Sequence, residues 1–439
     1  MLVKYFFAIT VGVCYNPLEN TFCEDTAMDR YFFTANRAAL MNKIEGDCVL
    51  VSFSGLPKRR SADDDYPFTA NRDFVYLTGV EYKDIIYLAV RKSGEFSETL
   101  YIPPVDALIE RWHGRMLHES DVEEISGIKN YKYRNDFMPD LWHALNASPK
   151  LYLDLDPAEP WQDKEFPQQF AERIKAERSS VEICDYFPIM QQLRSIKAPE
   201  ELENLNKAIE ITAQGIAQVL KTARPGIYEY NIRAEFEKVL ADNGVHTPAF
   251  ATIVGAGRNS LCLHYNEEDC LVQDGDLVQL DLGAQYGLEC ADISRVFPAN
   301  GRFTPQQRSI AKLCADTVDY VCSKARPGMH IKDLNAIQDA YLLTPLKALG
   351  LAETAEDIKK YRWHSISHHL GMDTHDSCGR DAAILPGSVC TLEVGVYIEE
   401  WGFGVRIEDD MLMTEHGGVN LSKDLIPRIP DEIEKAMGK

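Results

Sequence analysis

Two segments of the sequence each carry a pair of acidic residues on apolar strands that are separated by a short turn. Asp281 and Asp292 lie in QLDLGAQYGLECADISRVF, and Glu393 and Glu408 lie in TLEVGVYIEEWGFGVRIED. Two-residue loops, at 286–287 in the first segment and at the EW dipeptide in the second, predict antiparallel hairpins in which the two acids of each pair lie directly opposite each other. Opposed carboxylates repel at a Cβ separation of about 5 Å. Four such acids predict a bound cation, and a divalent metal ion suits them best.

The length and the charge of the chain restrict its architecture and its partners. At 439 residues the chain is too long for one ordinary core, so we expect two domains. Its 45% hydrophobic and 26% charged residues are typical of a globular protein. With 46 basic and 68 acidic residues, the net charge of -22 argues against nucleic acid or an anionic membrane as a partner. No stretch approaches the roughly 18 apolar residues that are needed to span a bilayer.

The cysteines and the N-terminal residues bear on the location of the protein. The 11 cysteines include no C-x-x-C pair, and several lie within apolar patterns, namely Cys48, Cys290, Cys314 and Cys390. We interpret them as reduced, buried thiols of a cytoplasmic protein. The segment YFFAITVGVCY resembles a short signal peptide, but no small-x-small cleavage site follows it. We therefore expect residues 1–27 to be an N-terminal extension rather than a secretion signal.

Helices and strands alternate along the first part of the chain, as in an α/β domain. The residue patterns predict helices over 28–44, 120–146 and 162–178, and strands near residue 48 and over 73–79, 84–90, 98–104 and 150–156. The domain boundary falls near 189–201, where Pro199 opens a long charged helix that runs to about Thr222. We predict an N-terminal domain over 28–190 and a second domain over 191–439.

The second domain contains an internal repeat. The tetrapeptide ARPG ends one helix at 223–226 and another at 325–328. One such tetrapeptide would be only an ordinary helix stop, but each copy is followed by a second helix and then by an acidic hairpin. The sequence therefore predicts a duplicated half-domain, in which each half supplies one acidic pair to a site on a pseudo-twofold axis.

Histidines gather between the two hairpins. His364, His368, His369 and His375 are four of the 11 histidines in the chain, and this density favours a metal ligand with catalytic neighbours. A further residue, His264 in SLCLHYNEED, is expected to end an apolar strand just before the first hairpin. Four carboxylates and one imidazole do not suit structural zinc, but they suit two Mn²⁺, Fe²⁺, Co²⁺ or Zn²⁺ ions. Such a pair implies metal-assisted hydrolysis.

These motifs resemble one known family, the pita-bread metallopeptidases, and within it aminopeptidase P. The segments that are similar to the successive metal-binding motifs of that family are DLGAQY, ADISRVFPANGRFTPQQ, SHHLGMDTHD, TLEVGVYI and GVRIEDDMLMTEHG. NRDFVYLTG and ERWHGRML resemble N-terminal segments of aminopeptidase P. The resemblance covers nearly all of 28–439. It implies an α/β (α+β) protein, with an N-terminal domain like those of creatinase and aminopeptidase P followed by a pseudo-twofold pita-bread catalytic domain.

The resemblance also implies roles for individual residues. The implied metal ligands are Asp281 on one ion, Asp292 and Glu408 bridging both ions, and His368 and Glu393 on the other. The implied catalytic groups are Glu393 as proton shuttle, His264 and His375 as substrate-binding groups that stabilise the gem-diolate, and His364 and Arg406 as groups that line or support the site. Arg380 and Trp112 match positions near the substrate cleft, where the tryptophan of the family can reach the cleft of a neighbouring subunit.

The activity implied by the resemblance is that of an Xaa-Pro aminopeptidase, which hydrolyses the bond between an N-terminal residue and a following proline through a hydroxide that bridges two metal ions. Mn²⁺ is the expected metal, with Co²⁺, Fe²⁺ or Zn²⁺ as alternatives. The expected partners are peptides with proline at the second position and further copies of the chain, in a homodimer or homotetramer. Two alternatives stay open, a prolidase that cleaves only Xaa-Pro dipeptides and a non-catalytic peptide-binding relative of the same fold.

The sequence departs from the family pattern beside the second acidic pair. Val394 stands where the family has proline after Glu393, and Ser294 replaces the usual threonine after the first pair. The loop at 399–403 is short, which is nearer to prolidases. Asp409 and Asp410 are expected to form a solvated acidic face or to support the metal ligands.

Overall fold

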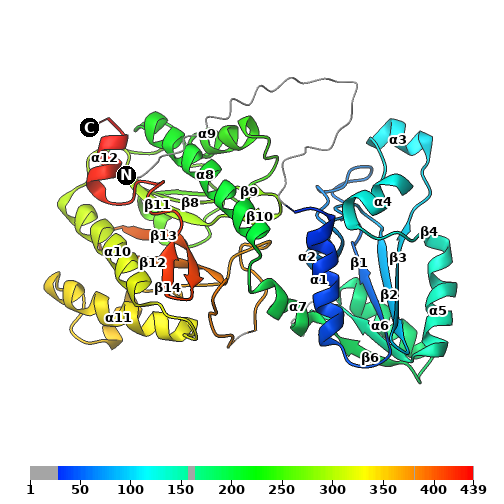
Figure 1. Ribbon diagram of the computed structural model, residues 1–439. Helices are drawn as coiled ribbons and strands as arrows, with labels where there is room; N and C mark the ends of the chain where they lie inside the picture. The colour runs from blue at the N-terminus through cyan, green and yellow to red at the C-terminus, as the bar shows by residue number, and fades with distance from the viewer. Residues whose placement is uncertain (1–27, 157–163, 380, 439) are drawn as a thin grey trace, which may run out of the picture.

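The computed structural model shows two domains side by side and describes residues 28–156, 164–379 and 381–438 (Figure 1). The predicted N-terminal extension, residues 1–27, lies outside the described residues. Within those residues, no helix has the length and apolar character that a bilayer crossing requires.

The N-terminal domain is built on one sheet. Its elements are α1 (Arg30–Lys43), β1 (Cys48–Phe53), α2 (Arg72–Thr78), β2 (Ile86–Lys92), β3 (Glu95–Ile102), α3 (Ala107–His113), α4 (Glu119–Ser126), β4 (Tyr131–Tyr133), η1 (Arg134–Asp136), α5 (Phe137–Ala147), β5 (Lys150–Leu153), α6 (Phe166–Glu177), β6 (Glu182–Asp185) and α7 (Phe187–Arg194). The strand order is β4-β3-β2-β1-β5-β6. β2 pairs antiparallel with both of its neighbours, and the other pairs are parallel.

Strand β1 illustrates how the sequence builds this domain. Successive side chains of a strand point to opposite faces of the sheet. Leu50 accordingly packs into a core with α1, α2 and α4, whereas Val49 and Val51 pack into a second core with α5 and α6. Both faces of the strand are therefore buried, which explains the apolar run from Cys48 to Val51.

One predicted strand of the N-terminal domain is wrong. Residues 73–78 lie in helix α2 instead, and Asn71 caps it by accepting a hydrogen bond from the Phe74 N–H at 2.8 Å. The helix ends at Gly79, whose φ of 70° is left-handed and whose Cβ would meet the Phe33 ring at 2.3 Å. Every residue of α2 after Arg72 is buried, so the run shows no helical periodicity in its hydrophobic pattern.

The predicted helix over 120–146 is also divided in two. α4 ends at Gly127, whose φ of 73° is left-handed, and α5 begins only at Phe137. Between them, β4 adds an edge strand to the sheet. A glycine in the left-handed conformation is a common helix stop, so the division has a clear local cause.

The second domain contains two three-stranded sheets covered by helices, and the short antiparallel pair β10-β9. Its elements are α8 (Pro199–Thr222), α9 (Glu229–Asp242), β7 (Ile253–Ala256), η2 (Gly257–Leu261), β8 (Leu277–Leu282), β9 (Gln285–Tyr286), β10 (Glu289–Cys290), β11 (Ile293–Pro298), α10 (Pro305–Lys324), α11 (Ile331–Ala348), η3 (Glu356–Lys360), β12 (Val389–Ile398), β13 (Phe403–Thr414), β14 (Gly417–Asn420) and α12 (Pro430–Ala436). The sheet orders are β11-β8-β7 and β12-β13-β14, both antiparallel.

The two halves of this domain follow the repeat that the sequence predicts. Gly226 and Gly328, which end the two ARPG tetrapeptides, have φ values of 87° and 86°. α9 follows the first copy and α11 follows the second, and each half continues into a three-stranded sheet that carries one acidic hairpin.

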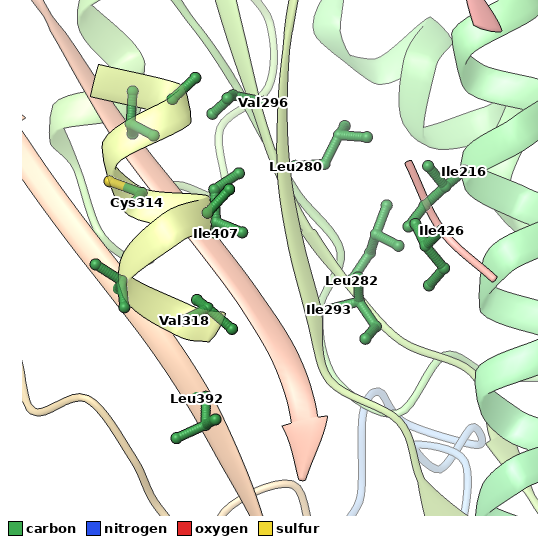
Figure 2. Packing of buried hydrophobic residues seen from close by; sticks show 14 of the residues in the cluster. Ile216, Leu280, Leu282, Ile293, Val296, Cys314, Val318, Leu392, Ile407 and Ile426 are labelled. Carbon is green, nitrogen blue, oxygen red and sulfur yellow. The ribbon is translucent and has the colours of Figure 1, made fainter. Parts of the chain in front are cut away.

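Long helices bury the outer faces of these sheets. Figure 2 shows Cys314 and Val318 of α10 beside Ile407 of β13, and Ile216 of α8 on the side of Leu282. These side chains belong to one hydrophobic cluster that runs through the domain. Complete burial of an aliphatic side chain contributes about 1.5–3 kcal/mol, so the cluster holds both sheets in place.

Polar side chains join the two sheets at their contact. The Gln279 amide of β8 accepts from the Arg406 N–H at 2.7 Å and donates to the Arg406 carbonyl at 3.3 Å. Arg295 of β11, which is fully buried, donates to the Glu408 carbonyl at 2.7 Å. Because buried polar groups of this kind are costly to leave unpaired, these bonds fix β8 and β11 against β13. The acidic faces of the two hairpins consequently meet.

Candidate metal centre and active site

The second acidic hairpin has the predicted register. Glu393 of β12 lies directly opposite Glu408 of β13. The strand continues through Val394, which pairs with Ile407 and is fully buried. The valine that replaces proline is therefore an ordinary member of the ladder, and both acids lie on one face.

The first hairpin differs from the prediction by two residues. Asp281 of β8 lies opposite Ser294 of β11 rather than opposite Asp292, and the turn is formed by Gly287 and Leu288. Their φ values of 52° and 81° are both positive, as a tight two-residue turn requires. A shift of two residues keeps every side chain on its face of the sheet, so the acids are diagonal neighbours.

Contacts outside the hairpin explain the shifted turn. Leu288 packs against the core of the N-terminal domain. The Asn204 amide of α8 donates to the Gly287 carbonyl at 3.0 Å, and a Cβ on Gly287 would meet that amide at 2.4 Å. Since leucine rarely adopts a positive φ, this turn depends on packing that the local sequence does not show.

Three predicted ligands converge on one point. Ligand atoms of Asp292, His368 and Glu408 all lie within 4.8 Å of one another. His368 Nε2 is 3.4 Å from Asp292 Oδ2 and 3.9 Å from Glu408 Oε1. Its other nitrogen, Nδ1, lies 3.0 Å from the His369 carbonyl, which assigns the proton to Nδ1 and leaves Nε2 free to bind a metal ion.

The other two predicted ligands border this group but are held by neighbours. Asp281 Oδ2 accepts from Arg406 at 2.7 Å, and Glu393 Oε2 lies 3.5 Å from His364 Nδ1. Among the described residues, neither Asp281 nor Glu393 belongs to the three-residue group. The structure thus brings all five candidates to one region, with three of them within reach of a single ion.

Of the four acids in this region, only Asp281 is paired with an arginine or lysine of the described residues, namely Arg406. Burial, and to a smaller extent the charge of Asp281, raises the pKa of Asp292 well above its usual range. Burial, and to a smaller extent the charge of Asp292, does the same for Glu408. Burial raises the pKa of Glu393 to about 7. One oxygen each of Asp281, Asp292 and Glu408 is buried without a hydrogen-bond partner. Divalent cations would satisfy these oxygens, so the residues fit a metal centre.

A hydrogen-bonded chain supports the centre from behind. Arg406 donates to Ser294 Oγ at 2.9 Å and to the Tyr397 hydroxyl at 3.0 Å, in addition to Asp281. The Tyr397 hydroxyl lies 2.8 Å from His364 Nε2. Burial lowers the pKa of His364 to about 4, so its imidazole is neutral and accepts from Tyr397. Ser294, which stands where the family has threonine, keeps the hydroxyl that accepts the bond from Arg406.

The expectation that Asp409 and Asp410 form a solvated face is wrong. Both residues are fully buried. Asp409 accepts from Arg295 at 2.6 Å, and Asp410 faces the Asp292 N–H at 3.4 Å. They therefore support the strands that carry the candidate ligands, which was the other expectation for them.

His264 is carried by a loop rather than by the predicted strand. The segment before it forms the short η2 helix, and the following residues are irregular. Partial burial lowers the pKa of His375, and the nearby imidazoles of His368 and His264 lower it further, so the three rings lie close to one another. The Leu263 carbonyl accepts from Arg406 at 3.4 Å, so this loop borders the candidate metal centre.

One buried carboxylate holds the His264 loop. Glu229, at the start of α9, is fully buried. Its two oxygens accept four hydrogen bonds, from Ala256 N at 2.7 Å, Asn259 Nδ2 at 2.9 Å, Tyr265 OH at 3.1 Å and Cys270 N at 3.1 Å. A carboxylate with four donors is a strong anchor. Nothing in the sequence marks Glu229 as an anchor, because an acid in the first turn of a helix is common without any such role.

Glu229→Gln is expected to lower kcat/KM about tenfold. The new amide would face the Cys270 N–H, donor against donor, and a shift of the His264 loop by about 1 Å is costly. The measurement is kcat/KM for a proline-second tripeptide, with and without His264→Ala. If Glu229 acts by positioning His264, then Glu229→Gln should lower kcat/KM much less in a protein that already carries His264→Ala. Glu98→Gln, which loses bonds to Arg37 and Tyr87 in the other domain, is the control.

Another buried network holds the loop of His375. Asp376, with its side chain 1% exposed, binds Arg194 Nη2 at 2.5 Å and Lys197 Nζ at 2.8 Å. Arg194 also binds Asp73 of the N-terminal domain at 2.8 Å. These ion pairs join the two domains beside the candidate site. Arg194 and Lys197 lie in LRSIKAPEE, which the sequence marked only as a domain boundary.

One predicted site residue, Trp112, is not brought to the centre within this chain. Trp112 is 77% exposed on α3, at the outer edge of the N-terminal domain (Figure 1). Arg380 lies outside the described residues.

Both domains of the chain match known protein families. Residues 33–152 match the aminopeptidase P N-terminal domain, and residues 203–415 match metallopeptidase family M24. The Xaa-Pro aminopeptidase of Escherichia coli K12 is 30% identical over 93% of this chain and 98% of the relative. That of Haemophilus influenzae is 31% identical over 91% of this chain and 95% of the relative.

The chain belongs to the aminopeptidase P family of M24 metallopeptidases. A Bacillus anthracis structure described as an aminopeptidase P has a TM-score of 0.91 at 37% identity and covers 94% of this chain and 99% of its own. A substrate complex of an E. coli aminopeptidase P variant has a TM-score of 0.85 at 29% identity and covers 94% and 98%. The predicted family, the two-part α/β fold and the class of metallopeptidase are thereby confirmed.

Proposed function

We propose that the chain is an Xaa-Pro aminopeptidase that removes the first residue from peptides with proline second. The convergence of Asp292, His368 and Glu408 in a member of the aminopeptidase P family carries this proposal. Asp281 and Glu393, which border the group, complete a set of four carboxylates and one imidazole. Hard oxygen ligands of this kind favour Mn²⁺, with Co²⁺, Fe²⁺ or Zn²⁺ as alternatives.

A pair of divalent ions held by these residues would polarise the scissile carbonyl and acidify a water molecule. The remaining work falls to side chains of this chain. Glu393, beside the His364 ring, takes the proton of the attacking water and returns it to the leaving proline nitrogen. His264 and His375 donate hydrogen bonds to the carbonyl oxygen as its negative charge develops.

The supporting residues keep these groups in one orientation. Arg406 holds the Asp281 carboxylate, and Tyr397 holds the neutral His364 ring beside Glu393. Gly395 lets both rings approach, since a Cβ there would meet His364 Nε2 at 2.3 Å. Orientation before the reaction is what lets such groups stabilise a transition state without reorganising.

Proline at the second position makes a dedicated enzyme necessary. The bond before proline is a tertiary amide with no N–H, and the pyrrolidine ring fixes the local backbone. An enzyme that grips the substrate by its free amine and the scissile carbonyl avoids any need for that N–H.

Hydrolysis of two substrates tests the activity and separates it from that of a prolidase. With Mn²⁺ added, we expect release of alanine from Ala-Pro-Ala, and Asp281→Asn should reduce this release strongly. A prolidase would cleave the dipeptide Ala-Pro alone. The short connection between β12 and β13, residues 399–402, is the feature that favours this second candidate. Absence of metal-dependent cleavage of either substrate would favour a peptide-binding relative.

Trp112→Ala is expected to weaken a homodimer or homotetramer. Trp112, Leu108 and Ile109 of α3 are 77%, 61% and 44% exposed, which is typical of an interaction surface. Light scattering across a range of concentrations measures the change in mass, and kcat/KM for a tripeptide should fall with it. Tyr31→Ala, which removes an aromatic ring that is 68% exposed on α1, serves as the control and should leave the mass unchanged.

A cytoplasmic location accords with the free cysteines.

A further inference from the structure

A cavity of about 380 Å³ lies between the two domains, next to the candidate metal centre. Its lining includes Asn71, Asp73 and Asp154 of the N-terminal domain, and Asp373, His375 and Asp376 of the catalytic domain. The ring of His375 has its centroid 4.3 Å from that of His368, one of the converging ligands. A peptide that is bound at the metal centre can therefore extend a side chain into this cavity.

The positive charges of the cavity are already neutralised. Arg194 donates to Asp73 at 2.8 Å, to Asp373 at 2.6 Å and to Asp376 at 2.5 Å. Arg72 lies 3.4 Å from Asp373. Arg194 Nε has no acceptor, but the guanidinium faces three carboxylates. An anionic ligand would be repelled by these acids.

Asp154 is the buried carboxylate of this cavity that has no cation paired with it among the described residues. The residue is 8% exposed, and Oδ2 accepts a bond from Asn71 Nδ2 at 3.2 Å. Oδ1 is buried without a partner, as is Oδ2 of Asp73, and no ion pair joins Asp154 to a cation among the described residues. Burial, followed by the charge of Asp73, raises the pKa of Asp154 to about 7. A buried carboxylate in this state is costly unless a cation approaches it.

We propose that Asp154 and Asp73 bind the cationic side chain of a lysine or arginine in the peptide substrate. A lysine ammonium carries three donors, and Asp73 and Asp154, which line the cavity, each have one buried carboxylate oxygen without a hydrogen-bond partner. The volume suits a long flexible side chain. The inference rests on the proposed peptidase function and adds a preference to it: basic peptides are better substrates than neutral peptides of the same size.

Matched peptides test this preference. Norleucine has nearly the shape of lysine without the charge, so Ala-Pro-Lys is compared with Ala-Pro-norleucine, and Lys-Pro-Ala with norleucine-Pro-Ala. We expect kcat/KM to be about tenfold higher for lysine in at least one pair. The ratio should fall below about threefold in Asp154→Asn. It should be unchanged in Asp140→Asn, which removes a charge that is bound to Tyr101 and Lys132 outside the cavity.

Three results would overturn the proposal. The first is an equal kcat/KM for lysine and norleucine in both pairs. The second is a lysine preference that survives in Asp154→Asn. The third is faster hydrolysis of Ala-Pro-Glu than of Ala-Pro-Lys. If none of the peptides is hydrolysed, the proposed function itself fails. Calorimetric binding of Ala-Pro-Lys and Ala-Pro-norleucine to the full chain then decides on the cavity independently, with tighter binding of the lysine peptide supporting the proposal and equal binding refuting it.

Discussion

Asp292→Asn is expected to reduce kcat/KM for Ala-Pro-Ala more than about 100-fold, since even the partners of metal ligands cost 10–100-fold when they are lost. Asp292 is 4% exposed, and its carboxylate lies 3.4 Å from His368 Nε2. Asparagine keeps the shape but removes the charge that a shared metal ion needs. The measurement is steady-state hydrolysis together with the metal content of the purified variant.

Two observations separate this effect from misfolding. Asp292→Asn should keep or raise the Tm of the metal-free protein, because it relieves repulsion among the buried acids around Asp281. Asp140→Asn, a change of the same type in the N-terminal domain, should keep both metal and activity. Wild-type activity and metal content in Asp292→Asn would show that this carboxylate is not a ligand.

Asp376→Ala is expected to destabilise the protein by about 3–5 kcal/mol. The side chains of Asp376 and Lys197 are each 1% exposed, so the change leaves a buried ammonium without its carboxylate. Urea unfolding measures the loss. Adding Lys197→Met to Asp376→Ala should recover much of it, because the unpaired charge is then removed as well. Independent, additive effects of the two changes would contradict the coupling.

The same ion pairs predict how stability depends on pH. Burial alone would raise the pKa of Asp376, but Lys197 and Arg194 outweigh it and lower the pKa. A carboxyl whose folded pKa lies below its unfolded value stabilises the fold above the unfolded pKa of about 3.9, and this contribution is lost as the pH falls through the folded pKa. Wild type should therefore lose stability below about pH 4 more steeply than Asp376→Ala does. If wild type and Asp376→Ala lose stability equally steeply below about pH 4, this contribution is excluded.

The sequence predicted the second hairpin better than the first for a physical reason. Between Glu393 and Glu408, two long buried strands and a turn at Gly402, with φ of 74°, set the register locally. In the first hairpin, Leu288 takes a positive φ because it packs against the other domain. Only alternation along the strand was visible in the sequence, and alternation fixes the face but not the pairing.

Long-range contacts account for the other differences. α2 is buried on all sides by elements from elsewhere in the chain, which removes the period that identifies a helix. Glu229 lies 41 residues before Cys270, whose N–H it binds, and Arg194 lies 182 before Asp376. Motif spacing identifies candidate ligands because their order is fixed. Buried partners that join distant loops carry no such spacing, so they are found only in the structure.

Metal-dependent hydrolysis tests the central claim most directly. Metal-stripped protein is titrated with Mn²⁺, and release of alanine from Ala-Pro-Ala is followed at each addition. We expect negligible activity without metal and activity that rises to a plateau at about two ions per chain. Cleavage that persists in the stripped protein, or no cleavage at saturating Mn²⁺, would contradict it.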